Sequence, residues 1–315
     1  MTVAELAFQE ELAAPQEESQ AQAVWRRFRR HRLAMIGLTI AVLLVFACFI
    51  GPLLTPFDSN TIRGRDLLLL KDLPPLSTGP DGFHILGTDS LGRDYLTRLL
   101  QGGRVSLALA FVVVILTQVV GTIVGGISGY YGGWVDAVLM RIVDFLFTLP
   151  SLPIFMVLYV LIPKDAVPGG SITVLALVFI TLGWTGSSRL VRGMVLSLKN
   201  QEFAEAARAV GASNRRIILR HMIPNAIAPV LVAATLQVGG IVVGEAALSY
   251  LGFGVQPPDP SWGNMLQGAQ KLILTRPMQV FYPGMTIFLT SLSFNFIGDA
   301  LRDALDPRGQ LSAGH

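Results

Sequence analysis

The sequence has few of the residues that soluble enzymes rely on. Only 14% of its 315 residues are Asp, Glu, Lys or Arg, whereas soluble globular chains carry about 25%. A single cysteine, Cys48, has no partner for an internal disulfide. The four histidines (His31, His84, His221, His315) are scattered without metal-ligand spacing. These absences exclude a disulfide scaffold, and the sequence presents no catalytic or metal-binding cluster.

Apolar sequence is abundant instead, since 52% of the residues are hydrophobic. The first apolar run, 33–54, contains no charge, and at about 1.5 Å rise per residue it reaches roughly 33 Å, enough to cross a bilayer. The sequence therefore predicts an all-α polytopic membrane protein with six transmembrane helices. The expected spans are 33–54, 105–128, 137–162, 172–195, 223–247 and 280–300.

Lys and Arg are unevenly distributed over the segments between these spans. If the N-terminus is cytoplasmic, the inside segments hold fifteen of them and the outside segments nine, which is the bias of membrane proteins. The densest cluster, WRRFRRHR at 25–32, directly precedes the first span. We therefore predict that both termini are cytoplasmic and that the net charge of +3 reflects topology rather than nucleic-acid binding.

The segments outside the spans differ in composition. Residues 1–24 contain five Glu and no Lys or Arg, unlike the positive start of a signal peptide. The predicted organisation is a disordered cytoplasmic tail (1–24), a region with the first transmembrane helix (25–57), an extracytoplasmic loop (58–101), a transmembrane domain (102–303) with a long cytoplasmic loop (196–222), and a cytoplasmic C-terminal tail (304–315).

The cytoplasmic loop 196–222 has the pattern of two short helices. Its first half places four apolar residues on one helical face (Phe203, Ala206, Ala207, Val210). Gly211 suits the position after a helix C-terminus, and Ser213 suits the N-cap of a second helix. An apolar face on such a loop must be buried against something.

The motif Glu205-Ala206-Ala207, with Gly211 and Ile223-Pro224 after it, resembles the EAA loop of ABC importer permeases, E-A-A-x3-G-x9-I-x-L-P. His221 and Ile223 replace the Ile and Leu of that pattern, and RHMIPN at 220–225 is similar to the peptide-permease branch. In that family the loop forms a coupling helix that docks into a groove of the ATPase subunit. The resemblance assigns ATPase coupling to Glu202, Phe203, Glu205, Ala206, Ala207, Gly211, Arg215 and Arg216.

Three further blocks resemble dipeptide, oligopeptide and nickel permeases: HILGTDSLGRD at 84–94, EAALSYLGFG with PPDPSWG at 245–263, and the block at 294–308. The G-x4-G spacing in the first block lacks the Lys and Ser/Thr of a phosphate loop, so we expect no ATP site here. Two interpretations remain for the polar residues of the outer blocks, a loop held by ion pairs and turns or contact with an external binding protein. The residues concerned are Asp89, Arg93, Asp94 and Trp262.

Glu245 lies at the outer end of the fifth span, where a carboxylate costs a few kcal/mol unless it is partnered or hydrated. It could line the translocation path or accept a substrate amine, or it could be a buried acid bonded to Ser249. Pro150 and Pro153 should kink the third span, and kinked helices often border a pathway. Three glycines in G-x3-G steps (Gly121, Gly125, Gly129) permit close helix packing, within the chain or at a subunit interface.

The resemblance covers residues 24–309 and implies the type I ABC importer permease fold in the inner membrane of a bacterium. It implies no catalysis and no bound cofactor in this chain, with ATP and Mg used by partner subunits. The implied partners are a second homologous permease, two ATP-binding subunits, an extracytoplasmic binding protein and membrane lipid. The expected substrates are di- or oligopeptides, with nickel chelates, glutathione or another small solute as alternatives. A secondary transporter, the competing class, would need mid-membrane ionisable pairs and inverted repeats.

Overall fold

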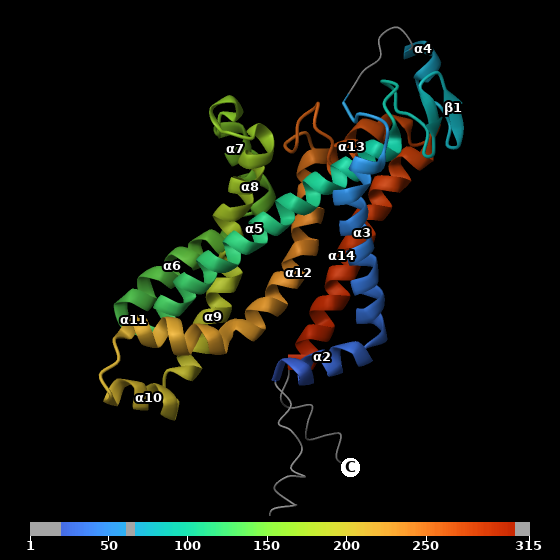
Figure 1. Ribbon diagram of the computed structural model, residues 1–315. Coiled ribbons are helices and arrows are strands. Elements are labelled where there is room, and N and C mark those ends of the chain that lie inside the picture. The colour runs from blue at the N-terminus through green and yellow to red at the C-terminus, as the bar shows by residue number, and fades with distance from the viewer. Residues whose placement is uncertain (1–19, 61–66, 306–315) are drawn as a thin grey trace, which may run out of the picture.

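The computed structural model describes residues 20–60 and 67–305, which form a bundle of long helices (Figure 1). The helices are α2 (Gln20–Arg30), α3 (Arg32–Leu54), α4 (Leu67–Leu70), α5 (Tyr95–Tyr131), α6 (Gly133–Thr148), α7 (Ser151–Leu161), α8 (Gly170–Gly183), α9 (Thr185–Leu198), α10 (Glu202–Ala209), α11 (Asn214–Ile217), α12 (Ile223–Tyr250), α13 (Trp262–Ala269) and α14 (Pro277–Leu305). An antiparallel hairpin joins β1 (Ser77–Gly79) to β2 (Gly82–His84), pairing Ser77 with His84 and Gly79 with Gly82. Short 3-10 turns lie at Lys164–Ala166 and Gln270–Leu272.

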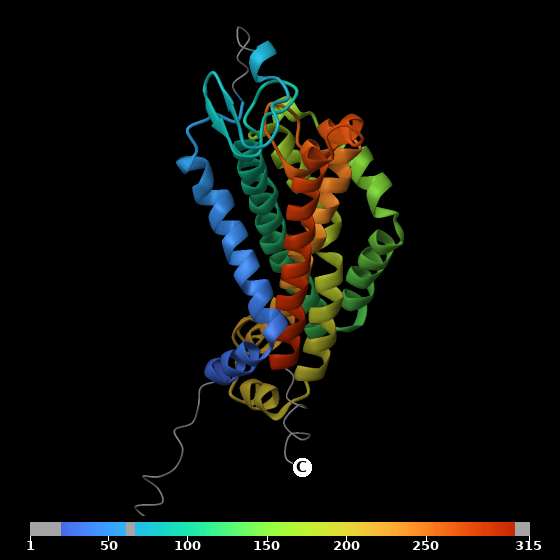
Figure 2. The same cartoon turned by 90° about the vertical axis from the view of Figure 1, so that its right-hand side faces the viewer.

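The two ends of the bundle are built differently (Figure 2). One end carries α2, α10 and α11 and is called the arginine end. The opposite end carries the β1–β2 hairpin, α4 and α13 and is called the loop end (Figure 1). The first and last described helices meet at the arginine end, where Arg27 Nη1 donates to the carbonyl of Ala304 at 3.4 Å.

Five helical stretches among the described residues are long and apolar enough to cross a membrane: Arg32–Leu54, Tyr95–Tyr131, Gly170–Leu198, Asn214–Tyr250 and Pro277–Leu305. The remaining expected span, 137–162, is divided into α6 and α7, which meet at 94°. Pro150 is the N-cap of α7, and proline forces the residue before it out of the helical region. The bend predicted at Pro150 is therefore confirmed, whereas Pro153 lies inside the first turn of α7 and not at the break. The bent pair completes a sixth span only if its halves count together.

Several boundaries differ from the expected ones. Helix α5 begins at Tyr95 rather than near residue 105, because the Asp94 side chain accepts from Thr97 N at 2.8 Å and caps it. The predicted N-terminal tail is helical from Gln20 onward, and its residues 1–19 lie outside the described part. Helix α14 continues to Leu305, into the segment predicted as a C-terminal tail, of which residues 306–315 are not described.

The second helix predicted in the loop 196–222 is not separate from the fifth span. Helix α11 continues through a π-helical turn at Ile218–Met222 into α12. Ser213 is its N-cap as predicted, and its Oγ accepts from Arg216 N at 3.4 Å. The span that follows therefore reaches from residue 214 to residue 250 as one continuous, curved helix (Figure 1).

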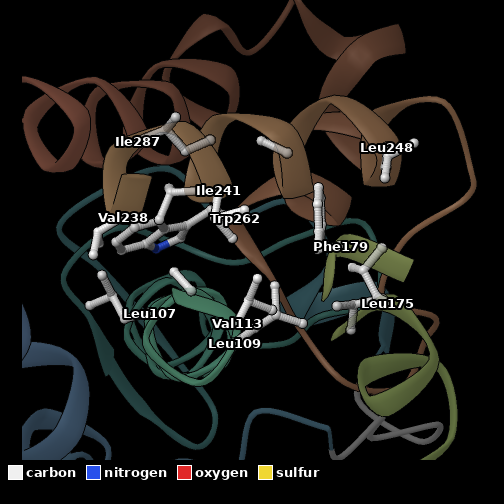
Figure 3. Close-up of a cluster of buried hydrophobic side chains, with 14 of the residues drawn as sticks. Leu107, Leu109, Val113, Leu175, Phe179, Val238, Ile241, Leu248, Trp262 and Ile287 are labelled. Carbon is white, nitrogen blue, oxygen red and sulfur yellow. The ribbon is translucent and has the colours of Figure 1, made fainter. Parts of the chain in front are cut away.

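The main core lies where α5, α8, α12 and α14 face one another, and it includes α13 (Figure 3). Trp262 is the largest fully buried side chain of this cluster, and its indole Nε1 donates to Leu99 O at 3.0 Å. Helix α5 also packs closely on α9. A Cβ on Gly121, Gly125 or Gly129 would overlap α9 atoms, so these glycines serve packing within the chain.

Candidate functional site

Helix α10 is a short helix whose end is fixed by a glycine. Gly211 has φ of +76°, a conformation that favours glycine, and its N–H donates to Arg208 O at 3.0 Å. Ala212 N also donates to Ala207 O at 3.0 Å, which closes the helix end in the manner of a glycine C-cap. The prediction that Gly211 follows the C-terminus of a helix is confirmed. A Cβ there would meet nothing within 4 Å, so space is open around it.

The apolar residues of α10 divide between two faces. Ala204 and Ala207 are buried, at 0% and 9% exposure, against a cluster that includes Val191, Ile217 and Met222. Phe203 and Val210 remain 38% and 85% exposed. Ala207, which the resemblance assigns to ATPase coupling, packs on the chain's own core, where its small side chain lets the helix approach closely.

The uncovered surface of α10 is therefore formed by Phe203, Ala206 and Val210, and it is called the α10 apolar face. Phe203 leans toward His221, with ring centroids 6.4 Å apart. Glu202, Glu205, Arg215 and Arg216 are exposed around it. Glu205 has no side-chain hydrogen bond or ion pair within the described part of the chain, and Arg208 holds the loop by donating to the carbonyls of Ala204 and Lys199.

Two ion pairs tie the helices above α10 together, and sequence analysis did not identify them. Asp136 of α6 accepts from Arg192 Nε at 2.5 Å and Arg192 Nη2 at 2.6 Å, and also from Ser128 of α5. Asp144 pairs with Arg189 at 2.7 Å, and this arginine lies over the Phe147 ring. These contacts join α5, α6 and α9 to one another, and α9 leads into α10. The sequence does contain a signal for these pairs, because two Asp residues near the third span could be matched with two Arg residues near the end of the fourth.

At the loop end, Glu245 is fully buried. Ser249 Oγ donates to its Oε1 at 2.6 Å, and Ser106 Oγ donates to its Oε2 at 2.9 Å. Each serine in turn accepts a backbone N–H at 3.3 Å, from Val255 and Trp262 respectively. Of the alternatives for Glu245, the structure favours the buried acid bonded to Ser249, because the carboxylate is enclosed and connects α12, α5 and the loop before α13.

The block 84–94 is likewise held from within. Asp89 accepts from Leu91 N at 2.9 Å and from Arg93 N at 3.0 Å, and its Oδ2 accepts from Arg93 Nε at 2.8 Å. Asp94 Oδ1 lies 2.8 Å from Nδ1 of His84, whose Nε2 lies 3.0 Å from Asp81. The interpretation as a loop held by ion pairs and turns is favoured.

The four residues considered for binding-protein contact differ in exposure. Asp94 and Trp262 are 4% and 0% exposed and contact the chain's own groups. The side chains of Asp89 and Arg93 are 12% and 13% exposed and pair with each other. All four residues are therefore engaged mainly by the chain's own groups. In the described part of the chain, no group of three or more His, Cys, Asp or Glu side chains could hold a metal ion.

The chain matches the family described as binding-protein-dependent transport system inner membrane component over residues 121–310. Residues 19–75 match the N-terminal TM domain of oligopeptide transport permease C. The oligopeptide transport system permease protein OppC of Bacillus subtilis is 40% identical over 282 residues, covering 90% of this chain and 88% of that protein. The glutathione transport system permease protein GsiD of Escherichia coli is 39% identical over 284 residues, covering 90% and 89%.

A solved inward-facing structure of the MetNI methionine ABC transporter is also similar, with a TM-score of 0.48 at 21% identity, over 66% of this chain and 96% of that one. The family match agrees with the expected permease fold of type I ABC importers and with a multi-pass inner-membrane location. ATP hydrolysis in such importers is performed by separate subunits. The chain therefore belongs to the inner-membrane permease components of binding-protein-dependent transport systems, as a permease subunit of an ATP-driven importer.

Proposed function

We propose that this chain forms one half of a peptide-translocating path, with its arginine end in the cytoplasm and its loop end outside. Paired with a second, homologous permease chain, it would bind one of two ATPase subunits, which use ATP and Mg. A binding protein would deliver the peptide at the loop end. The relatives named for oligopeptide and glutathione transport support a substrate with a peptide backbone.

The observation that carries the proposal is the α10 apolar face. Val210 is 85% exposed and Phe203 38% exposed at the end of the molecule that carries the arginines, where this chain does not cover them. An apolar surface of this kind marks an interaction site. The clusters of Arg at this end, at 26–32 and 215–220, support its cytoplasmic location.

Motion of the ATPase would reach the membrane through two connections. Helix α10 follows α9 after a short turn, and the chain returns through α11 into the continuous helix that ends at Tyr250. The buried pair Ala204 and Ala207 fixes α10 to both segments through the cluster with Val191 and Ile217. A displacement of α10 is therefore passed to α9 and α12 rather than absorbed in a flexible loop.

The test is whether the α10 apolar face holds the ATPase. The substitution Val210→Asp places a charge on it without disturbing the core. We expect at least tenfold less ATPase subunit to co-purify with the tagged chain in mild detergent, since burial of an unpaired charge costs several times the 1.4 kcal/mol of a tenfold change. The matched control is Leu274→Asp, at a leucine 94% exposed at the loop end.

Equal loss of the ATPase in both variants, or no loss in Val210→Asp, would contradict the docking assignment. The substrate class is tested separately, by ATP-dependent uptake of trialanine into proteoliposomes that contain the complete complex and its binding protein. Uptake without ATP, driven by an ion gradient through this chain alone, would favour a secondary transporter instead.

A further inference from the structure

A basic cavity of about 390 Å³ lies at the loop end, between the loop that precedes α5 and helix α13. Its polar lining comes from Arg93, Arg98, Asn264, Gln267 and Lys271. A smaller cavity of about 80 Å³ shares Arg93, Arg98 and Asn264 with it and includes Asp89. Ligand sites in proteins usually measure about 300–1,000 Å³, so the larger cavity has the size of a binding site for a small molecule.

The positive charges in this cavity exceed the negative ones. Asp89 Oδ2 serves two arginines, lying 2.7 Å from Arg93 Nη2 and 3.6 Å from Arg98 Nε. The Arg98 side chain is only 7% exposed, and Lys271 forms no ion pair within the described residues. The two cavities together therefore contain three cationic side chains (Arg93, Arg98, Lys271) and one carboxylate, that of Asp89. An excess of partly enclosed positive charge is costly unless an anion compensates it.

Two polar groups of the cavity, Arg98 and Asn264, are held in place by hydrogen bonds to the surrounding backbone. Arg98 Nη1 donates to Ser59 O at 2.7 Å, so its remaining guanidinium nitrogens are oriented by a fixed anchor. Asn264 Nδ2 donates to the carbonyls of Val255 and Asp259, and its Oδ1 accepts from Ser261 N. Below them, Trp262 is fixed in the core. A site whose groups are already oriented loses little entropy when a ligand binds.

The cavity is left open by a glycine. A Cβ on Gly268 of α13 would meet no atom within 4 Å, and Gly268 lines both cavities. Its helical conformation does not require glycine, because its φ is not among the positive values. A larger side chain at this position would therefore project into the cavity without displacing the fold.

We propose that this cavity binds the C-terminal carboxylate of the peptide substrate as it enters the membrane, an inference that rests on the proposed function. Guanidinium groups bind carboxylates with strong, directional hydrogen bonds, and the lysine and the Gln267 amide add further donors. Every linear peptide has this carboxylate whatever its side chains. A site that recognises it would suit a subunit that accepts peptides of many sequences.

The experiment compares uptake of trialanine and of trialanine amide, which lacks the carboxylate. The complete complex is reconstituted in proteoliposomes with binding protein loaded to saturation with each peptide. Two variants change the cavity in different ways: Lys271→Gln removes an exposed charge, and Gly268→Leu fills the open space. The matched control is Lys71→Gln, at an exposed lysine of the same end that does not line the cavity.

We expect both cavity variants to lower uptake of the free peptide about tenfold, because Lys271→Gln removes a charged donor and Gly268→Leu fills the space that the carboxylate would occupy. Uptake of the amide should stay at its wild-type level, and Lys71→Gln should change neither. An equal fall for both peptides would overturn the proposal, since the cavity would then bind something other than the substrate carboxylate, such as an acidic side chain of the binding protein. Unchanged uptake in both variants would overturn it as well. A wild-type complex that takes up neither peptide would instead overturn the proposed function.

Discussion

The arginine end and the loop end each carry a short helix, α10 and α13, and the two helices differ in how much of their surface the chain buries. At the loop end, α13 buries Trp262 completely, and the Trp262 backbone N–H donates to Ser106 Oγ, whose hydroxyl in turn donates to Glu245. At the arginine end, α10 buries only two alanines and leaves Phe203 and Val210 uncovered. The difference indicates that α13 is packed within this chain, whereas the chain itself leaves the α10 apolar face uncovered.

The stability of the two ends should differ accordingly. Substitutions of the buried groups at the loop end are expected to lower the stability of the protein, because its buried polar and aromatic groups depend on one another. Substitutions on the α10 apolar face are expected to leave the fold intact and to alter transport. Three measurements test this contrast.

The largest effect is expected from Trp262→Ala at the loop end. It removes a fully buried ring and its hydrogen bond to Leu99 O, and such truncations cost about 3–5 kcal/mol. The midpoint of thermal unfolding of the purified complex should fall clearly. The control Trp134→Ala, at a tryptophan 77% exposed, should shift the unfolding free energy by no more than about 0.5 kcal/mol. Similar shifts in both variants would contradict the central role of Trp262.

A smaller effect on stability, with a marked effect on transport, is expected from Gly211→Asp at the arginine end. Space is open at this position and its φ is +76°, which Asp and Asn adopt more readily than other residues. The complex should therefore assemble, while the new charge beside the α10 apolar face lowers uptake about tenfold relative to ATP hydrolysis.

Gly211→Asn is the matched variant, because it has nearly the same shape without the charge. It should keep at least half of the wild-type uptake per ATP hydrolysed. If Asn and Asp variants lost coupling equally, backbone strain at Gly211 rather than the surface charge would be responsible, and the docking argument would be weakened.

The smallest effect is expected from Asp136→Asn, which breaks the pair that ties α6 to α9 above α10. The Arg192 side chain is 34% exposed, so solvent screens the interaction and the expected loss is about 1 kcal/mol. Hydrogen exchange should increase in α6 and at the start of α10, and not in α13. The exchanged pair Asp136→Arg with Arg192→Asp should restore protection, and failure to do so would show that Ser128 and the local packing matter more.

The sequence predicted most of the transmembrane architecture, because lipid imposes long apolar runs that are visible without a structure. It also predicted the Gly211 turn, the Ser213 N-cap and the bend at Pro150, since each depends on local backbone chemistry. It did not predict that Ala204 and Ala207 face inward together. The helical pattern put Phe203, Ala206, Ala207 and Val210 on one face, but which part of that face is buried depends on what packs against it.

The roles of the polar residues were even less accessible from sequence. Glu245, Asp94 and Trp262 looked available for substrate or partner contact, yet each is enclosed by groups distant in the chain, such as Ser106 for Glu245. The same holds for the basic cavity, which combines Arg93 and Arg98 with Lys271 from a different loop.

The sequence by itself determined the membrane-spanning helices, their capping residues and the family, because those features are encoded by hydropathy, backbone preference and short motifs. Only the tertiary structure decided which polar groups are structural and which remain available. Burial and hydrogen-bond pairing depend on residues that are far apart in the chain, and they separate the enclosed Glu245 from the uncovered Val210.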